Sequence, residues 1–214
     1  MIGMVYKDFL VLRKQISYYF IFLAVYAGLV VAGVFDASIL SALVVVIGMM
    51  LPMTSIAYDD LARWDKYAAA TPAGRRGMVT AKYLFSLLSL LATALLVLAL
   101  ALVLSLLNIA EAAPLELLFS TLACVGVALL LESVIIPVLF KFGAEKSRAI
   151  SITIFVAIFG GFFLAVSALE KSGPLPAPPA WFLGALPLLL VMAVIGGLAI
   201  SYFISQGIMA KKEL

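Results

Sequence analysis

The sequence predicts an all-α polytopic membrane protein with six transmembrane helices in a single domain, residues 1–214. Of its 214 residues, 66% are hydrophobic and 12% are charged, whereas a soluble domain has about 45–50% apolar and about 25% charged residues. Long stretches without Asp, Glu, Lys or Arg follow one another along the chain. A membrane-spanning helix needs about 20 apolar residues, so these stretches account for nearly the whole length.

The six predicted spans lie between charged segments that mark their ends. Two cytoplasmic loops, 59–82 and 141–148, and a C-terminal tail, 206–214, hold most of the remaining residues. A segment with four prolines, 170–180, precedes the last span and predicts an extended connector. The spans cover residues 15–35, 37–58, 83–108, 117–140, 149–169 and 181–205.

The basic residues predict the orientation of the spans. With six spans, 13 of the 14 Lys and Arg residues fall on one side of the membrane, and only Lys171 falls on the other. Loops rich in Lys and Arg stay in the cytoplasm. We therefore expect both termini to be cytoplasmic.

The first 14 residues predict a helix of their own. Apolar residues recur at helical spacing from Ile2 to Ile16, while Lys7, Asp8 and Lys14 collect on the opposite side. This pattern favours an amphipathic helix in the cytoplasmic interface. Alternatively, these residues extend the first span into water.

The loop at 59–82 predicts a second short helix, over residues 59–70. Asp59 and Asp60 suit its first turn, and Asp59 is placed four residues before Arg63. Trp64 is either a protein-contact anchor or an aromatic residue at the level of the lipid headgroups. In the loop at 141–148, Gly143 fits the positive φ of a helix C-terminus.

Glu132 is the one charged residue deep within a predicted span. A charge at that depth costs several kcal/mol by insertion scales, so this side chain should face a bundle interior, a cavity or a partner. It could contact a cationic substrate on a translocation pathway. Alternatively, it is a neutral side chain that is hydrogen-bonded to Ser133 or to a neighbouring span.

Several kinds of chemistry are absent from the sequence. It has no histidine, a single cysteine (Cys124) and no phosphate-binding loop. We therefore predict no catalytic, cofactor-binding or metal-ligating residues, no nucleic-acid partner and no enzymatic activity of the chain by itself. If ATP is used, another chain must hydrolyse it.

The chain resembles the small six-span permeases of bacterial ABC exporters, the type-2 ABC transporter membrane subunits. The resemblance extends over almost the whole chain. It rests on YKDF at 6–9 with Lys14, YDD at 58–60, RWDKY at 63–67, Pro72, Arg75, AKY at 81–83, and FKFG at 140–143 with Glu145, Lys146 and Arg148.

The resemblance implies a location in the bacterial plasma membrane and two protein partners: a second permease subunit and a separate ABC ATPase that binds ATP and Mg. It also implies a coupling helix at 59–70 that docks on the ATPase, and a second, smaller cytoplasmic contact. The implied docking residues are Asp59, Asp60, Arg63, Trp64, Asp65, Lys66 and Tyr67, with Lys141, Glu145 and Arg148 in the second contact.

The apolar spans favour a hydrophobic or amphipathic substrate, and related permeases export peptides or confer antibiotic resistance. The alternative is a stand-alone secondary transporter or channel. That class would need buried ion-coordinating groups or paired discontinuous spans.

Overall fold

The computed structural model describes residues 2–107, 109, 112–171 and 180–212, although several side chains between 145 and 187 lie outside that description. In these ranges the chain consists of helices joined by short turns, with no strand, which confirms the predicted all-α class. The helices are α1 (Ile2–Val31), α2 (Ser38–Leu61), α3 (Trp64–Ala69), α4 (Gly74–Leu106), α5 (Pro114–Lys171) and α6 (Ala180–Lys211).

Five helical segments of the described chain are long and apolar enough to cross a membrane. They are Ile2–Val31, Ser38–Leu61, Gly74–Leu106, Pro114–Ala144 and Leu188–Lys211. The expected fifth span, 149–169, falls in the second half of α5, where many side chains are outside the described residues. A total of six spans therefore stays a prediction. Most of the proline-rich connector, 172–179, also lies outside the described residues.

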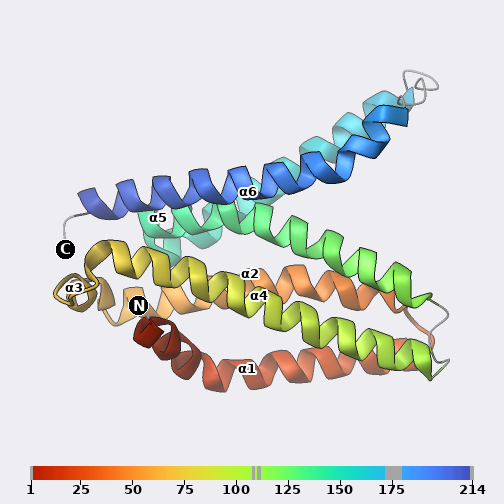
Figure 1. The fold of residues 1–214 in the computed structure, drawn as a ribbon, viewed down its shortest axis with the longest axis horizontal. Coiled ribbons are helices and arrows are strands. Elements are labelled where there is room, and N and C mark those ends of the chain that lie inside the picture. Colours follow the sequence, from red (N-terminus) through yellow and green to blue (C-terminus); the bar gives the residue numbers. More distant parts are fainter. Residues whose placement is uncertain (1, 108, 110–111, 172–179, 213–214) are drawn as a thin grey trace.

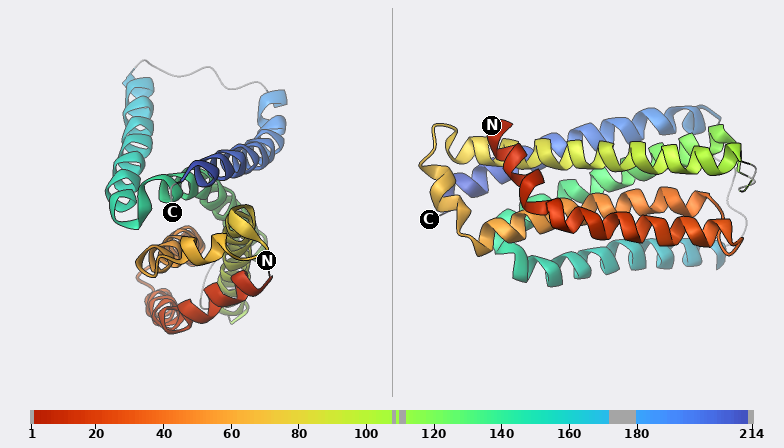
Figure 2. Two further views of the ribbon diagram at one scale, coloured as in Figure 1. Left: turned by 90° about the vertical axis from the view of Figure 1, so that its left-hand side faces the viewer. Right: turned by 90° about the horizontal axis from the view of Figure 1, so that it is seen from below.

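The N-terminal residues are continuous with the first span, so a separate interfacial helix over residues 1–14 is not confirmed. Residues 2–14 are the first turns of the 30-residue helix α1, and these turns run at an angle to the rest of it (Figure 2). Asp8 was expected on a face toward water or headgroups but is 2% exposed. The reason is a set of ion pairs with α2 and α4, described below.

The predicted helix over 59–70 is in fact divided between two elements. α2 continues through Leu61, Arg63 adopts a left-handed backbone conformation with φ 48°, and α3 begins at Trp64. A left-handed residue other than glycine interrupts a helix. Asp59 and Asp60 therefore belong to the last turn of α2 and not to the first turn of the short helix.

α5 contains a sharp bend at Gly143, where φ is 75° and ψ is 171°. Such a backbone conformation is essentially restricted to glycine, which agrees with the positive φ expected at this position. The bend turns the chain back along the bundle, so that the two halves of α5 lie antiparallel (Figure 1).

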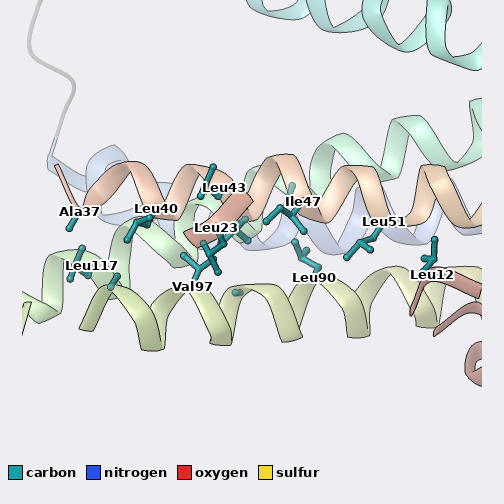
Figure 3. Packing of buried hydrophobic residues seen from close by; sticks show 14 of the residues in the cluster. Leu12, Leu23, Ala37, Leu40, Leu43, Ile47, Leu51, Leu90, Val97 and Leu117 are labelled. Atoms are coloured by element: carbon teal, nitrogen blue, oxygen red, sulfur yellow. The ribbon is translucent and has the colours of Figure 1, made fainter. Parts of the chain in front are cut away.

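The core lies between α1, α2, α4 and the first half of α5. Leu40, Ile47 and Leu51 of α2 are buried and point toward α4 (Figure 3). Gly48 permits this close approach, because a Cβ atom there would lie 2.5 Å from Leu90 Cδ1. A small residue on α2 thus sets its spacing from α4.

The segments that were predicted to be cytoplasmic meet at one end of the bundle. The beginning of α1, the short helix α3, the bend of α5 and the end of α6 lie there, while the α1–α2 and α4–α5 connections lie at the opposite end (Figure 1). This arrangement places the basic loops beside one another, and we call it the basic end of the bundle.

Candidate functional site

The short helix α3 has one buried side and one open side. Ala68 is fully buried and Trp64 is partly buried, and both belong to an apolar cluster with side chains of α4, α5 and α6. Tyr67 is 66% exposed, and Arg63 and Lys66 are also exposed. The other buried members of that apolar cluster are Met78, Val79, Ile136, Phe140 and Met209.

Charged groups add to the attachment of α3. Asp65 forms an ion pair with Lys212 after the end of α6, with 3.0 Å between Oδ2 and Nζ. The ammonium of Lys7 on α1 lies 4.5 Å from the centre of the Trp64 ring, a cation–π geometry. α3 is therefore held by groups from both ends of the chain, and its open side is left to solvent.

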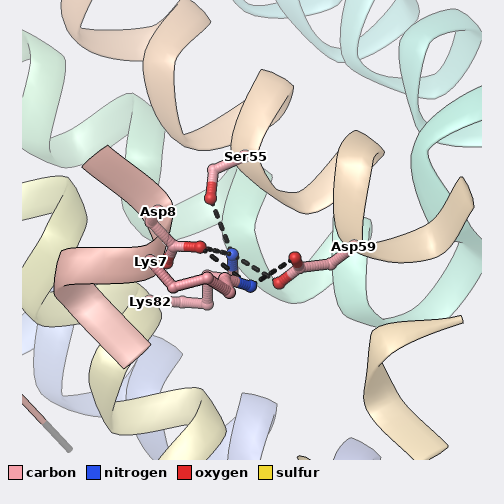
Figure 4. A network of polar contacts seen from close by, with 5 residues as sticks. All are labelled: Lys7, Asp8, Ser55, Asp59 and Lys82. Carbon is pink, nitrogen blue, oxygen red and sulfur yellow. Dashed lines mark hydrogen bonds and ion pairs between the residues drawn. The ribbon is translucent and has the colours of Figure 1, made fainter. Parts of the chain in front are cut away.

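Directly beneath α3, a cluster of four charges joins α1, α2 and α4. Lys82 Nζ lies 2.9 Å from Asp8 Oδ1 and 2.6 Å from Asp59 Oδ2. Lys7 Nζ lies 2.5 Å from Asp59 Oδ1 and 3.1 Å from Asp8 Oδ1. Figure 4 shows the two ammonium groups between the two carboxylates, with Ser55 beside them.

The charge cluster is buried and balanced. Asp8, Asp59 and Lys82 are 2%, 6% and 3% exposed, and the four charges sum to zero. Lys82 also donates a hydrogen bond to Ser55 Oγ at 2.6 Å. Removing one partner from such a buried set leaves an uncompensated charge, which costs about 3–5 kcal/mol. The cluster therefore resists any relative displacement of the three helices.

Within the described chain, two carboxylate oxygens of the charge cluster lack a hydrogen-bond partner. Asp8 Oδ2 is buried and has no hydrogen-bond partner there. Asp59 Oδ2 also makes no hydrogen bond of good geometry, although it lies within ion-pair distance of Lys82. The attraction to Lys82 at this oxygen is thus mainly that of a charge pair.

Sequence reasoning missed this cluster. Lys7 and Asp8 were placed on an outward polar face, Lys82 in a loop and Asp59 in the short helix, whereas the structure brings all four together. The available signal was the resemblance itself, because YKDF, YDD and AKY each contain cluster residues. Each of these motifs lies at the end of an apolar stretch, and none of them alone indicates that its charges pair with those of the other two.

Asp60 has a different role from its neighbour Asp59. Its Oδ2 accepts a hydrogen bond from the backbone N–H of Ala144 at 2.7 Å, immediately after the bend at Gly143. The first N–H groups of a helix lack partners within that helix. Asp60 therefore stabilises the beginning of the second half of α5 from α2.

The predicted second cytoplasmic contact lies at this bend. Lys141 is exposed, and its ammonium lies 5.2 Å from the centre of the Phe142 ring. Glu145 and Arg148 lie on the helix just after the bend, but their side chains are outside the described residues. A shallow cavity next to them is lined by Ala57, Asp60, Leu61, Phe142, Gly143, Ala144 and Lys146.

Glu132 faces the interior of the bundle. It is 2% exposed, and its Oε2 accepts a hydrogen bond from Ser86 Oγ of α4 at 2.5 Å. Ser133, the other expected partner, donates to the carbonyl of Leu130 instead. Glu132 Oε1 has no hydrogen-bond partner within the described chain. The arrangement agrees with a hydrogen-bonded side chain between two helices.

A ladder of hydroxyl groups attaches α6 to α4 at the basic end. Tyr83 OH lies 2.6 Å from Ser201 Oγ and 2.9 Å from Ser205 Oγ. Arg75 donates to the carbonyl of Ala210 at 2.9 Å, in the last turn of α6. A cation at that position satisfies unpaired carbonyls and the negative end of the helix dipole.

A comparison with protein families shows which family the chain matches. A family described as ABC-2 family transporter protein matches residues 3–210, which is nearly the entire chain. No curated protein and no solved structure matches the chain.

Proposed function

The chain belongs to the ABC-2 transporter family of membrane proteins, and we propose that it is the permease subunit of an ATP-driven exporter whose α3 docks on a separate ATPase. Members of this family are the membrane components of ABC transporters and are not themselves catalytic. Membership therefore implies an ATPase partner. ATP and Mg would bind to that partner.

The observation that carries the docking proposal is the two-sided environment of α3. One side is fixed through Ala68, Trp64 and Asp65, and the other presents Tyr67 with Arg63 and Lys66. Tyr and Arg are enriched among the residues that dominate binding energies at protein interfaces. Leu61, which is 79% exposed at the end of α2, lies instead beside the bend of α5, where it lines a cavity with Phe142 and Lys146.

Attachment to the bundle would allow α3 to act as a lever. A displacement of α3 by the ATPase would reach the spans through α2, which carries Asp59, and from there α1 and α4 through Lys7 and Lys82. Nucleotide binding can shift the permease only if the docked ATPase interacts differently with two of its conformations. A rigid helix on a rigid cluster transmits such a difference better than a flexible loop.

The bend of α5 is proposed as the smaller second contact. Lys141 is exposed there, and Glu145 and Arg148 follow on the next turns. Asp60 links this bend to the end of α2. Both proposed contacts are therefore connected to the same helix, which would let them move together.

We further propose that two such permeases form the translocation pathway for a hydrophobic or amphipathic substrate, such as a peptide or an antimicrobial. Two observations support this proposal. The spans are apolar in composition, and Glu132 accepts a hydrogen bond from Ser86 inside the bundle. The basic end, with both termini, would face the cytoplasm of a bacterial cell, as expected from its Lys and Arg residues.

The docking proposal is tested by co-purification with the ATPase encoded next to this chain. Tyr67→Ala should lower recovery of the ATPase at least tenfold without lowering the thermal stability of the permease. Tyr6→Ala is the matched control, because Tyr6 is 64% exposed at the same end but lies on α1. Equal recovery with Tyr67→Ala and wild type would overturn the assignment of α3.

The exporter proposal is tested separately in proteoliposomes that contain the permease with its ATPase. Hydrophobic peptides should raise ATP hydrolysis, and cross-linking should give a permease dimer. Failure of every peptide to change ATP hydrolysis, with transport that proceeds without ATP, would favour a secondary transporter instead.

A further inference from the structure

An apolar cavity lies between α1, α2 and α4, above the charge cluster. Its volume is about 140 Å³. An apolar cavity of this size accommodates an apolar group. It is lined by Phe9, Ile16, Tyr19, Phe20 and Leu23 of α1, Ile47 and Leu51 of α2, and Phe85, Ser89, Ala92, Thr93 and Leu96 of α4.

The cavity opens sideways between α1 and α4. Its back wall is α2, whose Ile47 and Leu51 are buried. Its rim carries the exposed residues Phe20 of α1, and Ala92 and Leu96 of α4. Both rim helices have the length and hydropathy of membrane spans. The opening therefore faces the hydrocarbon of the bilayer and not water.

The lining selects a hydrocarbon. Two of its three hydroxyl groups are already engaged, since Ser89 donates to the carbonyl of Ser86 at 2.9 Å and Thr93 donates to the carbonyl of Ser89 at 2.8 Å. The third belongs to Tyr19, which is partly exposed. A polar ligand would lose its own hydrogen bonds on entry, at a cost of about 1–3 kcal/mol for each group. An acyl chain has no such cost.

The cavity is bounded toward the charge cluster by two aromatic rings, and Arg13 falls on α1 between two of the lining residues without lining the cavity itself. Phe9 and Phe85 meet edge to face with 4.9 Å between ring centres, which separates the cavity from Lys82. Arg13 is exposed and lies four residues after Phe9 and three before Ile16, so it shares their side of α1. From Arg13 to Leu23 the helix rises about 15 Å, a length suited to an acyl chain with its headgroup at Arg13.

We propose that this cavity binds one acyl chain of an anionic phospholipid from the surrounding bilayer, with the phosphate held by Arg13. The lateral opening makes the bilayer the source of the ligand, and the guanidinium favours a phosphate at the interface. A lipid bound there would contact all three helices that the charge cluster joins.

The site is tested with the full-length protein in phosphatidylcholine nanodiscs that contain phosphatidylglycerol carrying a photoreactive acyl chain. Cross-links should concentrate on residues 16–23 and 85–96. Ala92→Phe should fill the mouth and lower cross-linking of these segments at least fivefold. Ala99→Phe, the same change on an exposed residue of α4 that does not line the cavity, should leave it unchanged.

The headgroup contact has its own pair of variants. Arg13→Gln should abolish the preference for the phosphatidylglycerol probe over a phosphatidylcholine probe of the same chain, and the exposed neighbour Lys14→Gln should retain it. Cross-links spread evenly over exposed apolar faces would overturn the site. Labelling that does not depend on Arg13 and that a hydrophobic peptide displaces would overturn the lipid assignment in favour of a transported substrate.

Thermal unfolding of each variant in detergent separates loss of binding from loss of fold. If Ala92→Phe lowers the melting temperature, Leu96→Trp at the same rim gives an independent closure of the mouth. Unchanged cross-linking of residues 85–96 in a well-folded closure variant would contradict the proposal.

Discussion

Asp59 and Tyr67 lie eight residues apart in one charged stretch, yet their environments are opposite. Asp59 is buried between Lys7 and Lys82, whereas Tyr67 is 66% exposed on the open side of α3. The inner region fixes three helices to one another, and the outer region is left available for a partner. Charge in the sequence therefore does not by itself mark the proposed docking surface, because the charged residues are shared between the two regions.

This contrast predicts the largest loss of stability at the inner region. Asp59→Asn leaves two ammonium groups facing the single carboxylate of Asp8. We expect the free energy of unfolding, measured by denaturant titration in micelles, to fall by about 3–5 kcal/mol.

A double variant sharpens this prediction. Lys82→Met alone also breaks the buried set, but Asp59→Asn combined with Lys82→Met restores the charge balance. The double variant should lose less free energy of unfolding than the two single variants lose together, because the effects of substitutions within one network are not additive. Strictly additive losses would show that the two side chains do not interact.

The bend of α5 should show an intermediate effect. Gly143→Ala forces a side chain into a backbone conformation that only glycine adopts readily, and places a Cβ atom 3.4 Å from Asp60 Oδ2. We expect a loss of about 1–3 kcal/mol. Gly126→Ala is the control on the same helix, with open space at its Cβ, and should raise stability by up to about 1 kcal/mol. Equal effects at both positions would contradict the bend.

The smallest effect is expected at the ion pair between Asp65 and Lys212. Their side chains are 15% and 30% exposed, so solvent screens the attraction. Asp65→Asn should lower the free energy of unfolding by about 0–1 kcal/mol. A loss as large as that of Asp59→Asn would mean that α3, and not the charge cluster, holds the basic end together.

Much of the fold could be predicted from the sequence, because apolar stretches bounded by charges are a strong signal. The all-α class and the positive φ of Gly143 were predicted. The break at Arg63 was not, since an arginine in a left-handed conformation carries no local sequence signal. Helix ends were also misplaced where ion pairs between distant segments extend a helix, as Asp59 does for α2.

The candidate site was predicted only in part, for the same reason. Short-range patterns located the charged loop, but they do not show which charges pair across 52 residues, as between Lys7 and Asp59, or 74, as between Asp8 and Lys82. Trp64, expected to be an anchor for a partner or for headgroups, is partly buried with the ammonium of Lys7 over its ring, a contact that the local sequence does not indicate. Its neighbour Tyr67 is the more exposed of the two aromatic residues.

The most direct test of the central claim is amide hydrogen exchange of the permease with and without its ATPase. Residues 61–70 should gain protection when the ATPase binds, residues 77–86 should stay unchanged because they are largely buried already, and Tyr67→Ala should abolish the gain. A stable complex in which residues 61–70 exchange as in the free permease would contradict docking on α3.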